Sequence, residues 1–242
     1  MAGAAGLAFI LVAWEAAALA MGKEIVLPSP VSVFGAALAL YPTPRFLSAL
    51  WATFLRGLAA FGFSAIVGIV AGLASGLRPL FRAALAPILT VIRATPVLAL
   101  VLIALLWFPG GFVPIFSAFL MAFPIMATSA AEGAVAVDPR LLEMAMLFRV
   151  PRREVFLRLR LPSAAPHLMS GAKNALGISW KVVVAGEILS QPARAIGTGM
   201  QSSRVMLESA SVFAWAVAAV ALCGLTEWAF GLVAKRSSRH GL

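Results

Sequence analysis

The chain has 242 residues, of which 62% are hydrophobic and only 12% are charged, and its mean hydropathy is +1.00. Soluble domains carry about 25% charged residues, so this composition excludes an ordinary soluble protein. Apolar runs of about 20 residues, the length that crosses a bilayer as a helix, recur along the chain. These runs do not alternate apolar and polar residues, which excludes a transmembrane β-barrel. The sequence therefore predicts an all-α integral membrane protein.

The formal net charge is +10. In a soluble protein this charge would suggest nucleic acid as a partner. In a membrane protein, Lys and Arg instead mark the loops that lie in the cytoplasm. We therefore predict contact with membrane lipid and no nucleic-acid partner.

Six membrane spans fit the apolar runs, within a single transmembrane domain that covers residues 1–242 and has its core at 45–234. The first run lacks a basic start and contains Glu15, so it is predicted to be a retained helix rather than a signal peptide. The prolines of 22–45 argue against a continuous helix there, and 191–204 is predicted to be a polar connection. The expected spans are about 5–21, 50–77, 83–108, 112–129, 163–190 and 207–234.

Basic residues gather in the turn after the second span, in the long loop 131–162 and in the tail. With six spans, these three segments lie on the same side of the membrane. The positive-inside rule then places the loop and both termini in the cytoplasm. The basic residues of these segments are Arg78, Arg82, Arg140, Arg149, Arg152, Arg153, Arg158, Arg160, Lys235, Arg236 and Arg239.

The loop 131–162 is predicted to form two short amphipathic helices. Asp138 and Pro139 suit a helix start, since Asp caps free amides and Pro fits the first position. Leu141, Leu142, Ala145 and Phe148 are expected on one apolar side of the first helix. Val150-Pro151 ends this helix and opens the second, which Pro162 is expected to stop. The two helices together predict a rigid cytoplasmic knob, which physics alone allows to rest on anionic lipid.

The loop resembles the cytoplasmic signature of ABC-type importer permeases. That pattern is Glu-Ala-Ala, three residues, Gly, nine residues and Ile-x-Leu-Pro. Glu143, Ala145, Leu159, Leu161 and Pro162 stand at matching positions, whereas Met144 and Arg149 depart from the pattern. Glycine would end the first helix cheaply in a left-handed conformation. Either the turn differs at Arg149, or the position has been retuned.

The resemblance extends from about residue 27 to 199. Segments 93–99, 106–108, 123–125 and 180–187 resemble permeases of the nitrate/sulfonate/taurine group. The resemblance implies the type I ABC importer permease fold, in the cell (inner) membrane, with the coupling-helix loop between spans four and five. It also implies alternating access, driven when this loop contacts an ATPase. The residues implied in this coupling are Leu142, Glu143, Ala145, Met146, Phe148, Arg149, Pro151, Leu159, Leu161 and Pro162.

The same resemblance implies several partners. The sequence contains no Gly-x-x-x-x-Gly-Lys-Ser/Thr phosphate loop, so the ATPase, expected in two copies, is a separate chain that holds ATP and Mg. A second permease copy completes the pore, most simply as a homodimer, and an external binding protein delivers a small solute. No catalytic or metal site is predicted in this chain, and it binds no cofactor of its own.

Polar residues within the spans prompt a functional hypothesis, because charges are costly in lipid. Arg93, Lys173, Trp180, Lys181 and Glu187 are the candidates for a substrate pathway. The cations would suit an anionic solute. The alternatives are that the charged residues snorkel or pair internally, and that Trp180 packs rather than stacks on a solute.

Two other functional classes remain as rivals. An ion-coupled secondary transporter usually shows repeats and broken helices at mid-membrane. A non-transporting membrane scaffold would use the basic loop only to hold lipid or a partner. The scaffold would tolerate a scrambling of residues 143–162 that keeps their charge, and a permease would not.

Overall fold

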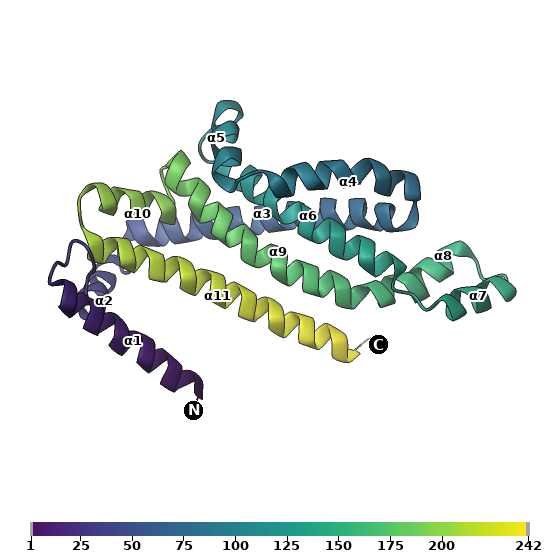
Figure 1. Cartoon of the computed structure of the whole chain (residues 1–242), viewed down its shortest axis with the longest axis horizontal. Coiled ribbons are helices and arrows are strands. Elements are labelled where there is room, and N and C mark those ends of the chain that lie inside the picture. The colour runs from purple at the N-terminus through teal and green to yellow at the C-terminus, as the bar shows by residue number, and fades with distance from the viewer. Residues whose placement is uncertain (1, 241–242) are drawn as a thin grey trace.

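The computed structural model describes residues 2–240, and in this part of the chain all regular structure is helical (Figure 1). A short π-helical turn, η1, connects α8 to α9. The elements are α1 (Ala2–Met21), α2 (Pro30–Leu40), α3 (Pro44–Leu77), α4 (Pro79–Ala94), α5 (Val97–Trp107), α6 (Val113–Val135), α7 (Pro139–Leu147), α8 (Arg152–Val155), η1 (Phe156–Arg160), α9 (Leu161–Ser190), α10 (Ile196–Val205) and α11 (Ser209–His240).

The core of the fold is the group formed by α3, α6 and α9, which pack along most of their length (Figure 1). Small residues allow the helix backbones to approach closely. A Cβ at Gly72 of α3 would collide with the carbonyl oxygen of Ala127 in α6. Farther along, a Cβ at Gly133 of α6 would lie 3.0 Å from Ala164 of α9. Gly62 of α3 has no neighbour within 4 Å of such a Cβ, so not every glycine in this helix serves packing.

Three of the described helices are long and apolar enough to cross a membrane alone, namely α3, α6 and the Ser209–Leu232 part of α11. The helix α9 has 30 residues but is more polar, since it carries Lys173, Lys181 and Glu187. The helices α4 and α5 meet the criterion only as a pair bent by 101°. The number of six spans therefore stays a prediction.

The sequence predicted one continuous span over 83–108, and this is wrong. The chain turns between Ala94 and Val97, where Thr95 is extended with φ −78° and ψ 126°. Pro96 explains the break, because it lacks an N–H and disfavours the α conformation of the residue before it.

The connections 22–45 and 191–204 are also more helical than predicted. Two of their prolines lie at helix starts: Pro30 begins α2 and Pro44 begins α3, where no N–H is needed. Similarly, Pro162 does not stop the chain's second loop helix. Instead η1 runs directly into α9, and the Leu161 amide donates to the carbonyl of Phe156 in a π turn just before Pro162.

The helix α2 is fixed to α11 through Tyr41, which follows its last turn. The Tyr41 hydroxyl donates a 2.9 Å hydrogen bond to the carbonyl of Ala214, and its ring stacks on Phe46 with centroids 4.5 Å apart. Burial raises the pKa of Tyr41 above its ordinary value, which further disfavours the loss of this donor's proton.

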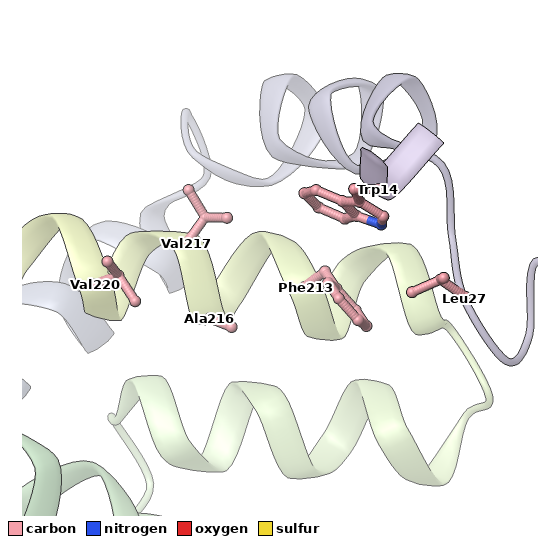
Figure 2. A pocket seen from close by; sticks show the side chains of 6 residues that line it. All are labelled: Trp14, Leu27, Phe213, Ala216, Val217 and Val220. Carbon is pink, nitrogen blue, oxygen red and sulfur yellow. The ribbon is translucent and has the colours of Figure 1, made fainter. Parts of the chain in front are cut away.

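The helix α1 lies against α11 through a single aromatic contact (Figure 2). Trp14 faces Phe213 with ring centroids 5.6 Å apart, and its Nε1–H donates to the carbonyl of Pro28 at 3.0 Å. The groove beside this contact has a volume of about 430 Å³ and is lined by Trp14, Leu27, Phe213, Ala216, Val217 and Val220. All six of these lining side chains are uncharged.

The close contact of α3 with α6 gives a test that uses one helix as its own control. We expect Gly72→Ala to destabilise the protein by about 1–3 kcal/mol, because backbone must move to accept the methyl group. Gly62→Ala should leave the stability unchanged or slightly raised, since its site is open. Thermal unfolding in detergent measures both, and equal effects would contradict the packing of α3 on α6.

Candidate functional site

The helices α7, α8 and the turn η1 form a projection at one end of the molecule, which we call the knob, residues 139–160 (Figure 1). Its start is the predicted one: the Asp138 carboxylate accepts a 2.9 Å hydrogen bond from the Arg140 amide, and Pro139 takes the first helical position. The five residues 131–135, predicted as loop, continue α6 instead.

The first knob helix ends in a left-handed turn at Arg149, which has φ +52°. The Arg149 amide donates to the carbonyl of Met146 at 3.0 Å, and the Val150 amide donates to that of Ala145 at 2.9 Å. This pair of bonds is the Schellman arrangement, in which glycine is usual. Of the two alternatives for Arg149, the structure has the left-handed geometry that glycine would adopt.

The knob carries large apolar side chains in the open. Met146, Leu147 and Phe148 are 70%, 82% and 77% exposed, and Met144 is 48% exposed. We call these four residues the apolar tip. Sequence reasoning placed Phe148 on the side of the helix that packs with Ala145, but the structure buries Ala145 and exposes Phe148, because Phe148 follows the last helical residue.

The base of the knob is fastened to the helical core. The Arg160 guanidinium donates a 3.0 Å hydrogen bond to the carbonyl of Ala134 at the end of α6. Ala164, in the first turns of α9, is fully buried against Gly133. The remaining residues implied in coupling differ in burial: Leu142, Leu159 and Pro162 are half-buried, while Glu143, Pro151 and Leu161 are exposed.

At the opposite end of α9, Glu187 is completely buried and fully hydrogen-bonded. Its Oε1 lies 2.8 Å from Nη1 of Arg56 in α3. The hydroxyl of Thr53 donates to the carboxylate, with Oγ1 at 2.9 and 3.0 Å from the two oxygens. The Gly197 amide donates to Oε2 at 3.1 Å. Glu187 therefore joins α3, α9 and the start of α10.

Two further bonds complete this arrangement. The Ile196 amide donates to Oγ1 of Thr53 at 3.0 Å, and Nη1 of Arg56 also donates to the carbonyl of Arg194 at 2.8 Å. The first amides of α10 are thus satisfied by side chains from other helices, which is what a free helix start requires. Sequence reasoning missed Thr53 and Arg56 as partners of Glu187. A buried carboxylate needs a cation, and Arg56 was available in another apolar run.

The other pathway candidates lie apart from Glu187. Lys173 and Lys181 are exposed on α9, and Trp180 is buried at 2% exposure with its ring edge against Gly57 of α3. Arg93 is exposed at the end of α4 and donates to Thr128 and to the carbonyl of Pro124 in α6. The structure therefore does not bring the five candidates together at one point.

The left-handed turn at Arg149 predicts that glycine changes the stability in opposite directions at positions 149 and 153. Arg149→Gly should stabilise the α7 turn by about 1 kcal/mol, because glycine adopts positive φ without strain. Arg153→Gly, in the helical turn of α8, should instead destabilise by about 1 kcal/mol. Amide hydrogen exchange of Val150, expressed as protection relative to its intrinsic rate, measures the first effect, and lower protection in Arg149→Gly would contradict it.

The buried ion pair of Arg56 and Glu187 generates a second prediction about stability. Glu187→Ala should lower the stability by about 3–5 kcal/mol, since Arg56 is left charged without its partner. Glu208→Ala, at an exposed glutamate, is the matched control and should change it by less than about 0.5 kcal/mol. Denaturation in mild detergent compares the two, and a Glu187→Ala protein of native stability would refute the role of this cluster.

Comparison with known proteins agrees with this architecture. Residues 64–239 match the family model described as "Binding-protein-dependent transport system inner membrane component". The chain is 30% identical over 207 residues to the taurine transport system permease protein TauC of Escherichia coli K12, covering 83% of this chain and 75% of that protein. It is 29% identical over 199 residues to the nitrate import permease protein NrtB of Synechocystis, covering 77% and 70%.

The fold is also that of a solved transporter. An inward-facing structure of the MetNI methionine ABC transporter superposes with a TM-score of 0.69 at 18% identity, covering 79% of this chain and 95% of that one. The match to the family model covers most of the sequence. The chain therefore belongs to the inner-membrane permease components of binding-protein-dependent ABC importers, as the resemblance of its loop predicted.

Proposed function

We propose that the knob of this permease is the surface that contacts the ATPase of the importer. The observation that carries the proposal is the apolar tip: Met146, Leu147 and Phe148 are mostly exposed on a projection outside the helical core. Exposed apolar clusters of this kind mark protein or membrane contacts. Glu143 is exposed on the same helix, where a partner protein can reach it.

The connections of the knob support its role in transmitting motion. Since η1 runs directly into α9, a displacement of the knob moves α9 with it. Arg160 ties the same segment to α6. At the other end, Glu187 ties α9 to α3 and to the start of α10. A push on the knob by an ATPase would thus reach the far end of the bundle through one continuous element.

The exposed face of α9 supports a pathway between two copies of the chain. The side of α9 that α3 and α6 leave uncovered carries the polar residues Ser170, Lys173, Asn174 and Lys181. Charged side chains are costly against lipid, so this face is better turned toward a second permease copy and a hydrated route. The lysines favour an anionic solute, in keeping with the taurine and nitrate permeases to which the chain is similar.

In this proposal two permease copies assemble with two ATPase subunits, which hold ATP and Mg, and an external binding protein delivers the solute. Both termini and the knob lie in the cytoplasm, as the distribution of Arg and Lys favours. This chain binds no cofactor or metal and performs no chemistry; it opens alternately to the two sides.

The test is the recovery of an ATPase with the chain from its native membrane in mild detergent. Phe148→Asp should reduce the recovered ATPase at least tenfold, because a charge in a docked apolar contact stays unpaired. Val205→Asp is the control: Val205 is 72% exposed at the end of α10, away from the knob (Figure 1). Mass spectrometry measures the amount of ATPase that is recovered with each variant.

A chain that is recovered without an ATPase, or with one that ignores Phe148→Asp, would contradict the docking role. Intact-complex mass measurement on the same sample counts the permease copies. A single copy per complex would contradict the pore between two chains.

A further inference from the structure

A cavity of about 540 Å³ lies between α9, α10 and α11. This size is within the range of small-molecule sites in proteins. It differs from the groove beside Trp14 in having a charged residue in its lining. The lining residues are Trp180, Lys181, Val184, Met200, Ala216, Ala219, Val220, Cys223 and Gly224.

The polar lining groups of this cavity are the Lys181 ammonium, the Cys223 thiol and the indole of Trp180. Lys181 is the one charged residue of the lining, and it has no carboxylate within 4.0 Å among the described residues. The indole of Trp180 is 2% exposed, and its Nε1–H has no acceptor in the described part of the chain. The benzene edge of this indole lies against Gly57 of α3, and its nitrogen is buried from solvent, so the indole forms part of the apolar wall. Lys181, without a carboxylate partner, calls for an anionic oxygen.

The rest of the lining is apolar, which restricts the kind of anion. An inorganic ion would lose its hydration in contact with Val184, Met200 and Val220 and would gain only Lys181 in return. An organic anion can instead bury hydrocarbon against these side chains. Each buried methylene then strengthens binding by about fourfold.

We propose that this cavity binds an organic anion, with its charged head on the Lys181 ammonium and a short hydrocarbon part against α10 and α11. The proposal rests on the permease function and narrows the solute at the α9 face to organic rather than inorganic anions. The site belongs to the permease itself and is separate from any recognition by an external binding protein.

Glu227 of α11 sets the strength of this site. Its Oε1 would lie 2.7 Å from a Cβ at Gly177, so the carboxylate lies over Gly177, one helical turn from Lys181 toward the knob. It also accepts a hydrogen bond from Sγ of Cys223 at 3.4 Å. A negative charge beside the cavity weakens anion binding. Glu227 thus keeps the site weak enough to release its anion.

The only cysteine of the chain, Cys223, lies in the cavity and reports on its occupancy. The experiment measures alkylation of Cys223 by N-ethylmaleimide, by intact mass, in the full chain in phosphatidylcholine nanodiscs. Butane-1-sulfonate should slow the alkylation at least fivefold, and sodium nitrate at the same ionic strength should not. From propane- to pentane-1-sulfonate, the half-protecting concentration should fall about fourfold per carbon.

Three variants locate the effect. Lys181→Met should abolish the protection, while Lys173→Met, on the same face of α9 but outside the lining, should keep it. Glu227→Gln should lower the half-protecting concentration by about threefold or more, each variant being compared with its own rate without anion. Protection that survives Lys181→Met, or that nitrate matches, overturns the proposal.

Two other results would also overturn it. If butane-1-sulfonate leaves the alkylation rate of Cys223 unchanged at every concentration, the cavity does not bind this anion. If phosphatidylglycerol in the nanodisc protects Cys223 and butane-1-sulfonate adds nothing, the cavity holds a lipid headgroup. Either result leaves the permease function intact as long as Phe148→Asp still releases the ATPase, so failure of the site and failure of the docking role are distinguishable.

Discussion

One buried carboxylate holds the far end of the bundle together. Glu187 is inaccessible to solvent, and its two oxygens are shared between a guanidinium, a hydroxyl and a backbone amide from α3 and α10. A buried ion pair adds little net stability, because desolvation offsets much of the attraction. Removing one partner is nevertheless strongly destabilising, because the other charge is left buried and unpaired. The cluster therefore specifies one arrangement of three helices rather than simply strengthening it. Every movement of α9 relative to α3 must carry this cluster intact or break it.

The contact between α3, α6 and α9 works by a different principle. In lipid there is no hydrophobic drive between helices, so close backbone approach and dispersion must hold them. The glycines and alanines at this contact, such as Gly72 with Ala127 and Gly133 with Ala164, give that approach. The other face of α9, where Lys173 and Lys181 stand, is exposed, and Lys181 borders the cavity that α10 and α11 complete. The helix is thus closely packed toward α3 and α6 and polar on the opposite side.

The sequence predicted the helical class, the knob and its first helix start, because these depend on local signals. Composition determines the class, and Asp138-Pro139 is a local cap. Local signals did not predict the partners of Glu187, since Arg56 lies 131 residues away and only the fold brings them together. The break at Pro96 and the π turn before Pro162 were misjudged for one shared reason. A proline can begin a helix, bend it or be tolerated within a wider turn, and its neighbours in space decide which.

The separation of Arg56 and Glu187 along the chain has a consequence for how the protein is made. Arg56 leaves the ribosome 131 residues before its counter-ion does. At about 5–20 residues per second, that interval is on the order of 10 s. During this time α3 carries an unmatched charge, which snorkels toward the membrane surface or stays in the insertion machinery. Only when α9 arrives do the two charges neutralise each other, so α3, the first helix of the core, reaches its final depth after α9 has been synthesised.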